Sequence, residues 1–156
     1  MGLKLATLVY VRDGDKTLML HKAKGYQKGK WNGLGGKFDA GESPEACMKR
    51  EVFEESGLSV ETAQLKGFIT FPDFDGLDDW YTFVYVVTEF SGELKASDEG
   101  SLEWVPNEKI LDLNIYDGDR IFIPWLKGNR FFSAVFRYDA GAFEDYEVVF
   151  YNPQTS

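Results

Sequence analysis

The chain has 156 residues, 44% of them hydrophobic, which is enough to bury one sizeable core, so we expect a single domain over residues 1–156. Its apolar runs fall far short of the roughly 20 residues that a spanning helix needs, which excludes a helical membrane protein. A formal charge of −9 disfavours binding to nucleic acid polymers such as DNA or RNA.

The first predicted elements are two strands at residues 3–12 and 17–21. A polar turn at residues 13–16 separates them, which is the pattern of a β-hairpin. Six glycines between residues 25 and 41 follow, too many for a regular element, and they predict a loop or irregular strand with unusual backbone angles.

A helix over residues 44–56 is the best-bounded element. Ser43 can cap free backbone N–H groups, Pro44 suits the first helical position, and Gly57 favours the left-handed conformation that ends helices. The remaining predicted elements are strands at 59–71, 80–90 and 102–105, short helices at 107–113 and 117–126, and closing strands at 131–138 and 146–151. This β-rich mixture with few helices indicates an α/β (α+β) fold.

Three glutamates share one face of the predicted helix. Glu51, Glu54 and Glu55 stand at positions i, i+3 and i+4, where like charges modestly destabilise a helix. Hard ions such as Mg²⁺ or Mn²⁺ bind carboxylate oxygens and keep waters for substrate phosphates, so the triplet is a candidate metal platform. Taken alone, however, such a triplet more often forms a solvated acidic surface.

A longer pattern, running from residue 36 to residue 58, favours the metal platform. The pattern is Gly-x5-Glu-x7-Arg-Glu-U-x-Glu-Glu-x-Gly-U, where U is a bulky apolar residue. The residues at its specified positions are Gly36, Glu42, Arg50, Glu51, Val52, Glu54, Glu55, Gly57 and Leu58. This segment resembles the Nudix box of Nudix hydrolases. The resemblance implies a Nudix fold, with a mixed β-sheet sandwiched between helices, and hydrolysis of a nucleoside diphosphate linked to another group.

The same resemblance implies roles for individual residues. The metal ligands would be the carboxylates of Glu51, Glu54 and Glu55 and the backbone carbonyl of Gly36, with Mg²⁺ as the ion and Mn²⁺ as a substitute. Arg50 would orient Glu54, and either Glu51 or Glu54 could be the general base. Outside the box, Glu99 matches a loop acid that assists the metals, and Lys22 matches a basic residue that faces the phosphates.

Segments 24–26, 30–37 and 116–124 resemble the MutT-like branch of the family, and within it the oxidised purine nucleoside triphosphatases. In these enzymes an Asn before the box and a late acid read the base, and Asn32 and Asp119 occupy those places. Aromatic positions of that pocket are matched by Tyr26, Tyr116 and Phe122. The implied reaction is hydrolysis of 8-oxo-dGTP to 8-oxo-dGMP and pyrophosphate. The family often has two adjacent acids where this chain has Gly118 and Asp119, so the second acid is either missing or displaced to Asp117, which leaves acceptance of oxidised adenine nucleotides open.

Two other functions remain as alternatives. A Nudix hydrolase of this type can act on ADP-ribose or a dinucleoside polyphosphate, and a non-catalytic Nudix module can sense a nucleotide. The intact acids of the box favour catalysis. We expect a small-molecule nucleoside triphosphate as the partner, no nucleic acid polymer, no membrane contact, and a monomer or homodimer. The lone Cys47 forms no internal disulfide, and we expect the protein in the cytoplasm.

Overall fold

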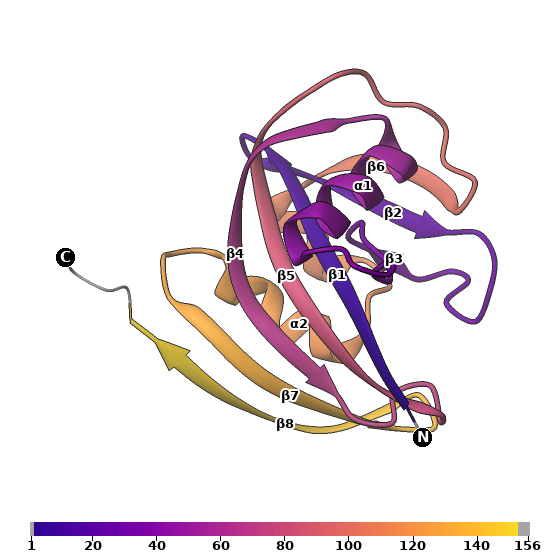
Figure 1. Cartoon of the computed structure of the whole chain (residues 1–156), viewed down its shortest axis with the longest axis vertical. Helices are drawn as coiled ribbons and strands as arrows, with labels where there is room; N and C mark the ends of the chain where they lie inside the picture. Colours follow the sequence, from indigo (N-terminus) through magenta and orange to yellow (C-terminus); the bar gives the residue numbers. More distant parts are fainter. Residues whose placement is uncertain (1, 153–156) are drawn as a thin grey trace.

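A twisted mixed β-sheet carries helices on both of its faces (Figure 1). The computed structural model describes residues 2–152, and within them the eight-stranded sheet has the order β3-β2-β1-β5-β4-β7-β8, with β6 paired to β2. The strands are β1 Gly2–Asp13, β2 Lys16–Lys22, β3 Trp31–Asn32, β4 Ser59–Phe71, β5 Asp78–Ser91, β6 Gly100–Pro106, β7 Phe131–Asp139 and β8 Ala142–Tyr151. The helices are α1 Pro44–Ser56 and α2 Asp117–Phe122, with 3-10 turns η1 Asn107–Asp112 and η2 Ile123–Leu126.

Side chains of the central strands alternate between two cores, one on each face of the sheet. Val9 and Val11 of β1 pack with Met48 of α1, which lies in front of the sheet in Figure 1. Tyr10, between them, points to the opposite face and packs with Phe122 of α2. This period of two is expected for a strand buried on both faces. The predicted sheet between helices is therefore confirmed.

The element order predicted from the sequence is also confirmed, and three details differ. The predicted helix over residues 117–126 is divided into α2 and η2, because Pro124 has no N–H to donate to residue 120. Residues 107–112 form a 3-10 helix. Strand β8 begins at Ala142, four residues earlier than predicted, because the turn at Ala140 and Gly141 leads directly into a mostly exposed edge strand whose polar residues hide its pattern.

The glycine-rich segment is fixed along β1, and this places it opposite α1. The N–H of Thr7 donates to the Gly36 carbonyl at 2.9 Å, and Val9 and Leu34 exchange two backbone hydrogen bonds at 2.7 and 2.8 Å. Gly35 has φ +125°, and a Cβ there would lie 2.2 Å from the Thr7 carbonyl oxygen, so only glycine allows this approach.

Helix α1 has the predicted ends. The Ser43 hydroxyl accepts a hydrogen bond from the Ala46 N–H at 3.1 Å, and Gly57 adopts φ +83° while its N–H donates to the Phe53 carbonyl. These caps determine where the helix that carries the glutamates begins and ends. Within the described residues, no helix is long and apolar enough to cross a membrane.

Candidate active site

A cavity of about 690 Å³ opens between the glycine-rich segment, helix α1 and the ends of β4, β5 and β7. Nine of the twelve residues predicted for the site line this cavity: Lys22, Tyr26, Asn32, Gly36, Glu51, Glu55, Glu99, Tyr116 and Asp119. Segments far apart in the sequence therefore meet at one place. The carboxylates of α1 form one end of the cavity, and the residues predicted to contact a base form the other.

Glu51 and Glu55 form the carboxylate end. Glu55 is almost completely buried and accepts a hydrogen bond from the Gly35 N–H at 2.7 Å, and burial raises its pKa to about 8. Burial also raises the pKa of Glu51. A Cβ at Gly36 would lie 2.7 Å from the Glu51 carboxyl carbon. The absence of a side chain at Gly36 thus leaves room for a carboxylate against the backbone.

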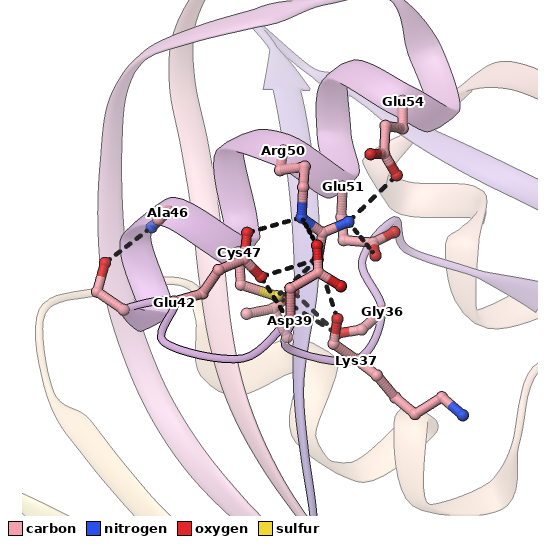
Figure 2. Close-up of polar contacts among 11 residues, drawn as sticks. Gly36, Lys37, Asp39, Glu42, Ala46, Cys47, Arg50, Glu51 and Glu54 are labelled. Carbon is pink, nitrogen blue, oxygen red and sulfur yellow. Dashed lines mark hydrogen bonds and ion pairs between the residues drawn. The ribbon is translucent and has the colours of Figure 1, made fainter.

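Arg50 lies at the centre of four carboxylates, as Figure 2 shows. Its Nε and Nη2 atoms donate to both oxygens of Glu42 at 2.7 and 2.9 Å, a bidentate pair that lowers the pKa of Glu42 to about 2. Its Nη1 atom donates to Glu51 at 2.9 Å and to Glu54 at 3.2 Å, and Nε lies 3.1 Å from Asp39. Arg50 and Glu54 do not line the cavity, but Arg50 contacts three residues that do, because it pairs with Glu51 and Asp39 and donates to the Lys37 carbonyl.

The donor set at this end fits a hard divalent cation, which prefers carboxylate and carbonyl oxygens. A cation would also offset the cost of burying Glu51 and Glu55. The conformation is not that of an assembled metal site, because within residues 2–152 no three Asp, Glu, His or Cys residues are placed to hold an ion. Glu51 and Glu54 are instead paired with Arg50. The metal-binding roles therefore stay a prediction.

Lys22 and Glu99 face each other at the edge of this end. The Lys22 ammonium donates to the Glu99 carboxylate at 2.9 Å, and this contact lowers the pKa of Glu99. Lys22 is the last residue of β2, and Glu99 directly precedes β6. Because β2 and β6 pair in the sheet, the two side chains lie close together. The structure thus brings together a predicted phosphate-facing cation and a predicted metal-assisting acid as an ion pair.

Asn32 and Asp119, the two polar residues predicted to contact a base, both line the cavity. The Asn32 Nδ2 atom is buried and has no hydrogen-bond partner among the described residues. Burial raises the pKa of Asp119 to about 7, so a large share of this carboxyl group keeps its proton near neutral pH. An amide donor without a partner and a carboxyl group that can both donate and accept are suited to reading the edge of a base.

Aromatic side chains line the same cavity. Tyr116 meets Phe74 edge to face at 5.8 Å between ring centroids, and Phe74 meets Tyr138 in the same way at 5.3 Å. Phe71 and Trp80 also line the cavity. Phe71, Phe74, Trp80 and Tyr138 were not predicted from the sequence, because an aromatic residue near a strand end or in a connection has the same pattern whether it faces the core or a cavity.

Phe122 was predicted to contact the base, and the structure places it elsewhere. It is fully buried in the core on the α2 face of the sheet, with its ring centroid 5.8 Å from that of Phe136 and 6.4 Å from that of Phe132. It does not line the cavity. Asp119, in the first turn of α2, reaches the cavity, whereas Phe122 lies one turn farther along and packs beneath the sheet.

Comparisons with known proteins agree with this geometry. Residues 2–126 match the NUDIX domain. The chain is 33% identical over 135 residues to the oxidized purine nucleoside triphosphate hydrolase of Danio rerio, with 86% of each chain covered. It is 32% identical over 141 residues to the uncharacterized Nudix hydrolase YvcI of Bacillus subtilis, with 87% of each covered. The solved structure of a MutT protein from Bacillus halodurans has a TM-score of 0.84 and 34% identity, covering 93% of this chain and 97% of that one.

Hydrolases of this kind act on small nucleotide substrates and generally need a divalent metal ion such as Mg²⁺. The NUDIX match extends over most of the chain, and the similarity to the relatives runs over nearly their whole length. Two of the box glutamates, Glu51 and Glu55, meet the glycine-rich segment at the cavity. The chain therefore belongs to the Nudix hydrolase family and to its MutT-like branch.

Proposed function

We propose that the protein is a Mg²⁺-dependent nucleoside triphosphate pyrophosphohydrolase that converts 8-oxo-dGTP and water into 8-oxo-dGMP and pyrophosphate. The observation that carries this proposal is the single cavity that joins the buried carboxylates of α1 to an aromatic pocket containing Asn32 and Asp119. In a cell, this reaction would remove an oxidised nucleotide from the cytoplasmic pool before it is incorporated into DNA.

The base end of the cavity supports an oxidised purine as the substrate. Oxidation of guanine at C8 adds a carbonyl oxygen and converts N7 from an acceptor into an N–H donor. The protonated Asp119 carboxyl group can donate to an oxygen and accept from an N–H, and the Asn32 amide N–H has no partner among residues 2–152 and can donate to the base. The faces of Tyr116 and Phe74 can stack on a flat base. The relative from Danio rerio carries the name of an oxidised purine nucleoside triphosphate hydrolase.

The carboxylate end supplies the hydrolytic chemistry. Water adds to phosphorus, the bond between the α and β phosphates breaks, and the proton lost by water passes to a carboxylate, either Glu51 or Glu54. The residues that would hold Mg²⁺ are Gly36 through its carbonyl, Glu51, Glu54, Glu55 and Glu99. When bound, the ion neutralises phosphate charge and lowers the pKa of the attacking water. Lys22 adds positive charge beside the phosphates.

The proposal is tested by comparing kcat/KM for 8-oxo-dGTP, dGTP, 8-oxo-dATP, ADP-ribose and a dinucleoside polyphosphate in Mg²⁺, with the products identified by phosphorus NMR. We expect 8-oxo-dGTP to be the preferred substrate, to yield pyrophosphate rather than inorganic phosphate, and to be left intact in EDTA. A clear preference for ADP-ribose, or turnover that persists in EDTA, would contradict the proposal.

A further inference from the structure

The connection between β4 and β5, residues 72–77, forms one wall of the cavity together with the first residues of β5. Its Phe74 and the nearby Trp80 both line the cavity. The Phe74 ring centroid lies 5.3 Å from that of Phe71 and 5.3 Å from that of Tyr138, so this side chain joins the connection to the aromatic pocket. The position of the connection therefore decides the shape of the pocket on this side.

The Asp75 carboxylate ties this connection to the start of β5. The Oδ1 atom of Asp75 accepts the backbone N–H groups of Leu77 at 2.9 Å and of Asp78 at 2.8 Å. Its Oδ2 atom accepts the indole Nε1–H of Trp80 at 3.1 Å. These donors lower the pKa of Asp75, so the group is ionised at neutral pH and its hydrogen bonds are charge-assisted. Asp75 itself is exposed and does not line the cavity.

The neighbouring aspartates provide a contrast. Asp79 also closes the connection, because its Oδ1 atom accepts the Asp73 N–H at 2.8 Å. Neither Asp73 nor Asp79 lines the cavity. Asp78 lies 3.8 Å from the Lys4 ammonium, on the adjacent strand β1. Asp75 alone among these four accepts a hydrogen bond from a side chain of the cavity wall.

We propose that Asp75 is a positioning residue for nucleotide binding: by holding the Trp80 indole and the backbone at Leu77 and Asp78, it fixes the wall against which the nucleotide packs. This inference rests on the proposed function. Asp75 contacts neither the carboxylates of α1 nor the reacting atoms, so its loss affects binding and leaves the hydrolytic step unchanged. A residue that only stabilised the fold would not separate KM from kcat in this way.

The kinetic test compares D75A, W80F and D79N with the unchanged protein. We expect D75A to raise KM for 8-oxo-dGTP about three- to tenfold, the range for losing a few exposed hydrogen bonds, with kcat within about twofold. W80F keeps a ring but removes the N–H donor, so adding D75A to W80F should raise KM by less than D75A does alone. D79N, the matched control, should leave KM unchanged. An equal rise in D79N, or a loss of kcat at constant KM, would overturn the proposal.

A second measurement does not depend on turnover. In 15N-labelled protein, D75A should shift the indole N–H resonance of Trp80 and speed amide exchange at Leu77 and Asp78, while D79N leaves the indole resonance in place. If the indole resonance does not move in D75A, the positioning role is rejected whatever the substrate. If it moves but 8-oxo-dGTP is not hydrolysed by the unchanged protein, the contact stands and the proposed function fails, so the two failures are distinguishable.

Discussion

Asp119 is a buried carboxyl group without a strong counter-charge, and its ionisation opposes folding. It is 6% exposed, and burial raises its pKa from 3.8 to about 7. The folded state therefore keeps the proton over a pH range in which the unfolded chain has lost it. Because the folded state binds more protons there, stability falls as pH rises from about 4 to about 7 and stays reduced above that window.

Replacing Asp119 with Asn should remove this dependence, because an amide keeps the shape of the protonated carboxyl group and has no charge to bury. At pH 8 we expect D119N to be more stable than the unchanged protein, with a free energy of unfolding that is larger by on the order of 4 kcal/mol. Near pH 4.5 the two should differ by less than about 1 kcal/mol. Urea unfolding at several pH values measures this difference, and a difference independent of pH would contradict the assignment of Asp119 as the titrating group.

At the scale of elements, Arg50 joins helix α1 to the loop before it. Its guanidinium bridges Glu42 and Asp39 in the loop to Glu51 and Glu54 in the helix. Without this cation, four carboxylates would face one another with no compensating charge from Arg50. The resulting repulsion and the lost bidentate pair both act against the folded loop.

Replacing Arg50 with Ala should lower the free energy of unfolding by about 2 kcal/mol, the range for losing charge-assisted hydrogen bonds. R50K keeps the charge but not the planar fork, so we expect it to recover only part of that loss. Denaturant unfolding at low and high salt checks both variants. If R50A is as stable as the unchanged protein, the bridge contributes nothing to the docking of α1.

The sequence predicts elements well where the signals are local, as at α1. Ser43 and Gly57 mark its ends because caps act over three or four residues, and the glutamate spacing places three side chains on one face. The bidentate pairing of Arg50 with Glu42 depends instead on a loop folding back on the helix. The aromatic pocket depends on where β4 and β7 meet, as the burial of Phe122 and the exposure of Phe74 to the cavity show. Contacts between segments that are distant in the sequence leave no local pattern in a single sequence.

At the scale of the whole molecule, charge is strongly segregated. Residues 16–38 contain six lysines and no acidic residue, while the formal charge of the chain is −9, so the remainder carries −15. Lys22 and Lys37 line the cavity, Lys28 lines the groove beside it, and the Lys30 ammonium lies 5.0 Å from the Tyr116 ring. A polyanionic substrate is thus attracted to the one basic segment of an otherwise acidic protein.

We therefore expect kcat/KM for a nucleoside triphosphate to fall about three- to tenfold between about 20 mM and about 200 mM NaCl at constant Mg²⁺, because salt screens this attraction. K28Q should lower kcat/KM at low salt and flatten the salt dependence while kcat stays the same. K127Q, which changes a lysine outside the basic segment and the cavity, is the matched control. A salt dependence identical in K28Q and the unchanged protein would contradict steering by this segment.

Strand β7 lies beyond the NUDIX match, which ends at residue 126, yet its Tyr138 lines the cavity and its hydroxyl accepts the Gly118 N–H at 2.8 Å. The helix with the box glutamates and part of the cavity wall thus occupy separate stretches of the sequence. Replacing the β7–β8 hairpin while keeping α1 unchanged would be a direct route to new nucleotide preferences. Evolution or a designer can vary this hairpin without disturbing the helix that carries the glutamates.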